Sequence, residues 1–149
     1  MISEIEQETS DINWFFTSGN KIGFVASAAG KLPGSVAYLD EKLELLWSYF
    51  KDLPETSEVL INPELEAVKN TVITNDYIED FNYMAKRGLY TFDKTIVNNF
   101  FDTNYHLVAK PTKPLSLDTL PEEIFTLISN ILYNGDIEGT NMIDVKTII

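Results

Sequence analysis

Residues 12–27, INWFFTSGNKIGFVAS, decide the fold class of this chain. Apolar side chains occupy every second position on both sides of a Gly-Asn turn: Ile12, Trp14 and Phe16 before it, and Ile22, Phe24 and Ala26 after it. This period of two around Gly19-Asn20 is typical of two antiparallel strands joined by a tight turn. Phe15 and Val25 fall on the second face, so we expect that face to be partly covered too. The stretch therefore predicts an N-terminal β-hairpin.

A helix is expected after the loop that follows the hairpin. Its apolar residues have the i, i+4, i+7, i+8, i+11 spacing of one buried helical stripe: Leu39, Leu43, Leu46, Trp47 and Phe50. Ser35 or Asp40 would cap this helix, and it would end near Leu53, just before Pro54. The sequence thus predicts a single helix over about residues 35–53.

The middle of the chain predicts one strand and two helices. The apolar run 59–61 is short enough for a strand, and Asn62-Pro63 combines a helix cap with a first-position proline. Asp76 is expected to cap the next helix, with Tyr77, Phe81 and Met84 on one side and Gly88 after its end. These elements would pack against the hairpin.

The second half predicts two strands and a final helix. Strands are expected over 89–92 and 105–109, paired antiparallel, followed by a helix from Pro121 to Gly135. Residues 142–149 would form an edge strand or a loose tail, and residues 1–10 a frayed polar segment that is either disordered or peripheral. Because the order lacks regular βαβ alternation, we expect one α+β domain over residues 1–149. It would be an antiparallel sheet, including the hairpin, packed against three to four helices.

The composition restricts the class of protein. A chain of 149 residues with 44% hydrophobic residues has the size and the material for one core. It has no cysteine, which excludes disulfides and thiolate metal sites and fits a reducing compartment. No apolar stretch has the length of a membrane span, and the acidic N-terminus does not look like a secretory signal. We therefore expect a cytoplasmic protein.

The net charge of −12 bears on the partner. Nucleic acids and anionic membranes would be repelled by such a surface, so neither is expected to bind. The charge can simply keep the domain soluble, or it can attract a protein with a basic patch. Monomer and weak homodimer are both compatible with the sequence.

Few residues suggest a specific site. The single histidine, His106, lies opposite Tyr105 and Leu107 in the strand pattern, so we expect it to face solvent or a shallow contact, or else to act as a base, ligand or switch. Asp76, Glu79 and Asp80 form an acidic cluster at a helix start, which suits the helix dipole and is a conceivable Ca²⁺ or Mg²⁺ site. We name these four as candidate partner-binding residues, and we predict no cofactor.

Other catalytic motifs fail on particular residues. Residues 27–31, SAAGK, end like a phosphate-binding loop, but Val25 and Leu32 stand where that motif needs glycine and serine or threonine. The 23 acids offer many carboxylate pairs and therefore no specific glycosidase pair. The 11 bases are scattered among those acids, unlike a nucleic-acid-binding surface.

Several segments together resemble a known class. Residues 13–27 are similar to a "WF…G-x-I…F-x-S" hairpin, followed by a Leu-Pro step at Leu32-Pro33 and an amphipathic helix. Residues 87–93 are similar to a "KGLY-x-Y/F-D" strand, and residues 110–121 to a "P-x-x-PL…LP" segment. In this order they resemble small bacterial proteins of the immunity class, which are encoded beside polymorphic toxins. The resemblance implies binding and neutralisation of a toxin, and no binding residue carries over from it.

Three functions follow as hypotheses. The first is a non-catalytic protein-binding domain of the immunity type, whose partner would be a toxin with a basic surface. The second is a small hydrolytic enzyme with a carboxylate-based site, which needs a pocket holding acids of different pKa. The third is a structural or scaffolding subunit, which needs a large apolar face.

Overall fold

The N-terminal hairpin is confirmed in the computed structural model, which describes all residues from Met1 to Ile149. Strands β1 (Asn13–Ser18) and β2 (Lys21–Ala26) pair antiparallel over their whole length. Gly19, in the turn, has a φ of +57°, a conformation that glycine adopts without a steric penalty. The local sequence pattern is therefore sufficient to specify this unit.

The hairpin belongs to a six-stranded sheet, and together with the helices it forms a domain of the predicted α+β class. The strand order is β1-β2-β4-β5-β3, and β6 pairs with the remaining part of β5. The four further strands are β3 (Val59–Ile61), β4 (Tyr90–Lys94), β5 (Asn104–Pro111) and β6 (Met142–Asp144). The expected antiparallel pairing of the 89–92 and 105–109 segments is found between β4 and β5.

The sheet is mixed, whereas the sequence favoured a fully antiparallel one. Strand β2 pairs with β4 in parallel, from Gly23–Tyr90 to Ala26–Asp93. A parallel pair needs a long crossover, and the helices and β3 between residues 34 and 85 supply it. Nothing in the local pattern of either strand encodes this pairing, because it depends on where the crossover returns.

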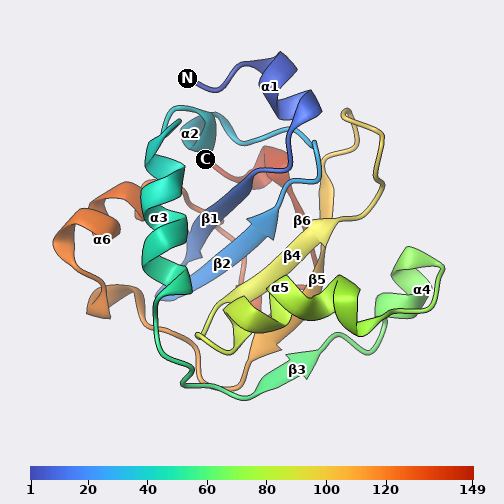
Figure 1. Cartoon of the computed structure of the whole chain (residues 1–149). Helices are drawn as coiled ribbons and strands as arrows, with labels where there is room; N and C mark the ends of the chain where they lie inside the picture. The colour runs from blue at the N-terminus through green and yellow to red at the C-terminus, as the bar shows by residue number, and fades with distance from the viewer.

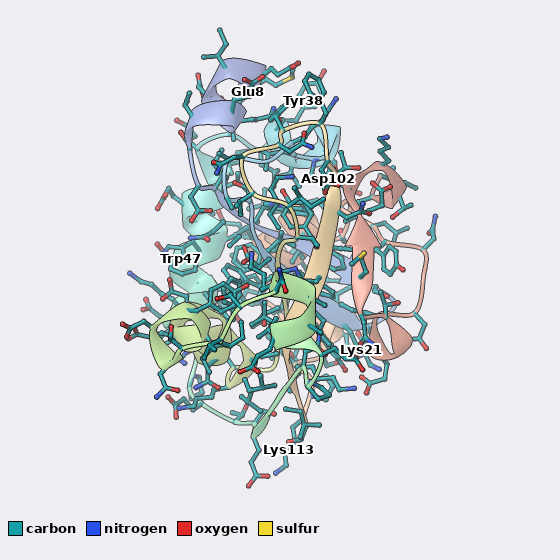
Figure 2. The ribbon with its side chains drawn as sticks, turned by 90° about the vertical axis from the view of Figure 1, so that its right-hand side faces the viewer. Glu8, Lys21, Tyr38, Trp47, Asp102 and Lys113 are labelled. Carbon is teal, nitrogen blue, oxygen red and sulfur yellow. The ribbon has the colours of Figure 1, made fainter.

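Helices cover the sheet on one face. On that face lie α3 (Lys42–Lys51) and α5 (Asn75–Ala85), which run in different directions across the sheet (Figure 1). Trp47 of α3 and Phe81 of α5 both pack on Phe24. On the other face, Phe16 packs against Phe92 and Tyr133. Figure 2 shows Trp47 and Lys21 on opposite sides of the sheet. Both faces of the sheet are therefore buried.

The prediction of a single helix over residues 35–53 is wrong. Two helices, α2 (Gly34–Ala37) and α3, replace it. Asp40 lies between them with a φ of +50°, a left-handed conformation that interrupts a right-handed helix. The cap of α5 also differs, because Thr74 and not Asp76 accepts a hydrogen bond from the Tyr77 N–H.

Three other helices complete the fold. These are α1 (Glu4–Thr9), α4 (Leu65–Lys69) and α6 (Glu122–Ile128). Helices α3, α4, α5 and α6 contact strands of the sheet, which agrees with the expected three to four packed helices. The α4 helix follows Asn62, whose side chain accepts a hydrogen bond from the Glu64 N–H at 3.0 Å.

Both chain ends are part of the domain. Near the N-terminus, Ile2 is buried and the Gln7 side chain accepts a hydrogen bond from Leu32 N at 3.0 Å. At the C-terminus, β6 pairs with β5, and Ile143, Val145 and Ile148 are buried. The loose-tail alternative for residues 142–149 is thus replaced by the edge-strand alternative.

Candidate functional site

The acidic cluster predicted from sequence lies on the outer side of α5. Asp76, Glu79 and Asp80 are all exposed, while Phe81 and Met84 on the same helix are buried against the sheet. The amphipathic spacing of the helix causes this, because its apolar stripe faces the sheet and the carboxylates are left in water. We call these three carboxylates the α5 acidic face.

Two members of this face line a surface hollow of about 410 Å³. Asp76 and Glu79 share it with Glu55, which comes from the loop before β3, and with Lys86 at the end of α5. Glu55 also lies 3.9 Å from the Arg87 guanidinium. Glu55 and Glu58 line a neighbouring hollow with Lys113. The α5 acidic face therefore continues towards the segment around β3, with more acids than bases along it.

The placement of His106 at a partner-binding surface is wrong. Its side chain is 0% exposed, because α5 covers the face of β5 towards which it points. Alternation correctly places it opposite Tyr105 and Leu107. Those two residues point to the other face of the sheet, and they are buried as well. A strand covered on both faces leaves no solvent side, so the rule that the other face is exposed fails here.

His106 instead belongs to a buried set of polar groups, which we call the Tyr77 network. The Tyr77 hydroxyl donates to Asp93 Oδ2 at 2.5 Å and lies 3.3 Å from His106 Nε2. Thr95 Oγ1 lies 3.1 Å from His106 Nδ1. Lys69 Nζ lies 3.9 Å from Asp93 Oδ2. The network thus links α4, α5, β4 and β5.

One proton arrangement satisfies the whole Tyr77 network. Because Tyr77 donates to Asp93, its oxygen accepts from a protonated Nε2 of His106. The unprotonated Nδ1 then accepts from the Thr95 hydroxyl. In this arrangement the histidine is neutral, with both ring nitrogens engaged.

Burial changes the protonation of these groups. It lowers the pKa of His106 to about 4, with a smaller effect in the same direction from the Lys69 charge. Burial also raises the pKa of Asp93, against the opposing effects of the Tyr77 hydroxyl and of Lys69. The pKa of Tyr77 is raised by burial and by Asp93. All three shifts favour the neutral forms, as expected when charge is removed from water.

The Tyr77 network lies apart from the hollows of the surface. Five of them, with volumes of about 160 to 520 Å³, are lined by residues outside the network. Its hydroxyl, imidazole and carboxylate groups use one another as partners. In this arrangement the network fixes the position of α5 on β4 and β5.

Sequence reasoning missed Asp93, Thr95 and Lys69. Asp93 and His106 are directly opposite each other in the β4–β5 ladder. The expected antiparallel pairing could have suggested this juxtaposition, but the register was not known, and it is shifted near Thr91 and Phe92. Tyr77 was assigned only to an apolar stripe, and its hydroxyl in fact reaches a carboxylate.

The surface charge is mostly uncompensated. Of the 23 acids, only four lie within 4 Å of a positive group: Asp40, Glu55, Asp93 and Glu138. The remaining 19 carboxylates have no ion-pair partner. A surface of this kind produces a negative potential that a positive partner can neutralise.

The structure shows neither a cluster of metal ligands nor a helix that could span a membrane. No group of three or more acidic or histidine side chains is positioned to hold a metal ion, and this includes the acidic cluster on α5. None of the helices has the length and apolar character required to cross a bilayer.

Comparison with known proteins adds no family to this description. No family model, curated protein or solved structure matches the chain.

Proposed function

We propose that this chain is a non-catalytic protein-binding domain of the immunity type. It binds a cognate bacterial toxin in the cytoplasm and covers a basic surface on that toxin. The observation that carries this proposal is the set of 19 carboxylates without an ion-pair partner, several of which gather on and beside α5. Opposite fields accelerate encounter and select the partner. The motif resemblance over residues 13–121 supports the same reading.

Co-expression with the product of the neighbouring open reading frame tests the proposal. We expect that product to be toxic alone and harmless in the presence of this chain, and the two to purify as a complex. Association should slow by about tenfold between low and high salt, because long-range attraction is screened. A non-toxic neighbour that forms no complex with this chain would overturn the proposal.

Charge variants locate the binding surface. Neutralising the α5 acidic face with Asp76→Asn, Glu79→Gln and Asp80→Asn should slow association with the toxin by about tenfold. The matched control removes the same charge from α1, with Glu4→Gln, Glu6→Gln and Glu8→Gln. Figure 2 shows Glu8 at the end of the molecule opposite Lys113. Equal effects of the two triple variants would mean that only net charge matters and that α5 is not the site.

A hydrolytic enzyme is the second candidate, and the Tyr77 network favours it. It connects the single histidine to a buried carboxylate through a tyrosine hydroxyl, which are residue types that can act in acid–base catalysis. Both ring nitrogens of His106 are already engaged, which argues for a packing role. Turnover of simple ester and phosphoester substrates by the wild type, abolished by Tyr77→Phe, would establish this candidate instead.

A further inference from the structure

The outer edge of β3 carries backbone groups without a protein partner. Thr112 N donates to Glu58 O at 3.0 Å, and Asn62 N donates to Val108 O at 2.9 Å. Hydrogen bonding alternates along an antiparallel strand, so residues 58, 60 and 62 face β5. The N–H and C=O groups of Val59 and Ile61 therefore point away from it. No hydrogen bond joins them to a loop or a side chain. We call residues 58–62 the β3 edge.

Apolar side chains and a hollow lie beside this edge. Leu60 is 52% exposed and Ile61 is 38% exposed. Both line a hollow of about 430 Å³, which Leu107 of β5 and Pro63 help to form. A strand that adds to a sheet edge gains affinity from main-chain hydrogen bonds and selectivity from such side-chain pockets.

The charge around the β3 edge is negative. Between Lys51 and Lys69 the chain has no base and five exposed acids: Asp52, Glu55, Glu58, Glu64 and Glu66. The nearest bases on β5 and after it are Lys110, which lies 3.7 Å from Glu138, and Lys113. A second copy of this chain would bring the same acids to the same edge, and like charges across a strand pair are destabilising.

We propose that the β3 edge receives an extended, basic segment of a partner protein as an additional strand of the sheet. Val59 and Ile61 exchange backbone hydrogen bonds with the segment. The hollow accepts one of its side chains against Leu60, Ile61 and Leu107, although Lys110, Glu64 and two asparagines also line it. The flanking acids pair with the lysines or arginines of the segment. This inference rests on the proposed protein-binding function and specifies the chemistry of the partner's contact.

The probe is a nine-residue synthetic peptide in which lysine alternates with valine, and its control is the same peptide with glutamate in place of lysine. We expect the lysine peptide to bind the full chain and the glutamate peptide not to bind. Backbone hydrogen exchange of Val59 and Ile61 should slow by at least tenfold when the lysine peptide is present. Absence of binding, or binding without protection of these two amides, would overturn the inference.

The matched variant is Ile61→Pro, which removes one outward N–H and none of the bonds to β5. We expect it to weaken peptide binding at least tenfold. Glu58→Gln combined with Glu64→Gln should weaken binding about fivefold, and Glu4→Gln combined with Glu8→Gln should leave it unchanged. Equal binding by wild type and Ile61→Pro, or a stable dimer of the free chain in sedimentation, would contradict the proposal.

The result separates this inference from the proposed function. If the toxin binds wild type and Ile61→Pro equally, the β3 edge is not used and the immunity function stands. If the lysine peptide binds through Val59 and Ile61 but the neighbouring gene product does not bind, the strand-addition surface stands and the immunity function fails.

Discussion

The two edges of the sheet differ in how their backbone groups are satisfied. At β1, Thr17 N donates to Ile131 O at 2.7 Å, and Tyr133 N donates to Thr17 O at 2.8 Å. The chain after α6 thus closes this edge at Thr17, which is buried. At β3, the corresponding groups of Val59 and Ile61 have no such cover. Phe15, the next outward-facing residue of β1, has no backbone partner either, but it is buried. Exposed edges invite pairing with another chain, so β3, beside which Leu60 and Ile61 are exposed, is the edge that can accept another strand.

Proline at the closed edge should have the largest effect on stability. Thr17→Pro removes both donors of the Ile131 carbonyl, the Thr17 N–H and the Thr17 hydroxyl. We expect a loss of about 4 kcal/mol in the free energy of unfolding, measured by denaturant titration. Thr17→Val keeps the N–H and should lose only about 1 kcal/mol. If Thr17→Pro unfolds like the wild type, the β1 edge is not closed by residues 131–133.

Acid should lower the free energy of unfolding through His106, which lies on β5, the strand next to β3. Its pKa is about 4 in the folded chain and 6.5 in the unfolded one, so only the unfolded chain takes up a proton between these values. The contribution of the neutral histidine to the free energy of unfolding is complete above pH 6.5 and is lost as the pH falls to about 4. The loss is about 3 kcal/mol.

Asp93 acts in the opposite direction. Its pKa is raised in the folded chain, so its contribution is greatest at acid pH and is lost as the pH rises through the folded value. The other groups around His106 are Tyr77, Thr95 and Lys69, and the raised pKa of Tyr77 keeps its hydroxyl neutral in this window. Unfolding free energies of wild type and His106→Gln between pH 4 and 7 isolate the histidine contribution, and parallel curves would refute it.

Removal of one hydroxyl should have an intermediate effect. Tyr77→Phe leaves Asp93 without its donor and His106 Nε2–H without its acceptor, while the ring packing against Phe81 is kept. We expect a loss of about 2 kcal/mol in unfolding free energy. Tyr38→Phe is the control, because Tyr38 is 75% exposed and makes no hydrogen bond through its hydroxyl. Equal stability of the two variants would show that the network does not hold α5 in place.

The smallest effect on stability should come from proline at the open edge. Ile61→Pro is the same kind of change as Thr17→Pro, but the N–H that it removes faces solvent. We expect a loss of about 0.5 kcal/mol, measured in the same titrations. A loss as large as that of Thr17→Pro would show that the Ile61 N–H has an intramolecular partner and that the two edges do not differ.

The candidate site was predictable only in part. The exposure of Asp76, Glu79 and Asp80 followed from the apolar stripe of α5, because the helical period separates the two sides of a helix. The Tyr77 network did not follow, since it joins residues 69 to 106 through a strand register that local patterns do not specify. The β3 strand was predicted from residues 59–61, but its position at an edge was not.

The sequence alone determined the N-terminal hairpin, the single α+β domain and the acidic surface, because turn chemistry, side-chain periodicity and charge are local properties of the chain. Only the tertiary structure decided that β2 pairs with β4 in parallel, that His106 is buried and neutral, and that Thr17 is covered while Ile61 is open. These outcomes depend on which distant segments meet, and the free energy that selects them is gained from burial and hydrogen bonding after the chain has folded back on itself.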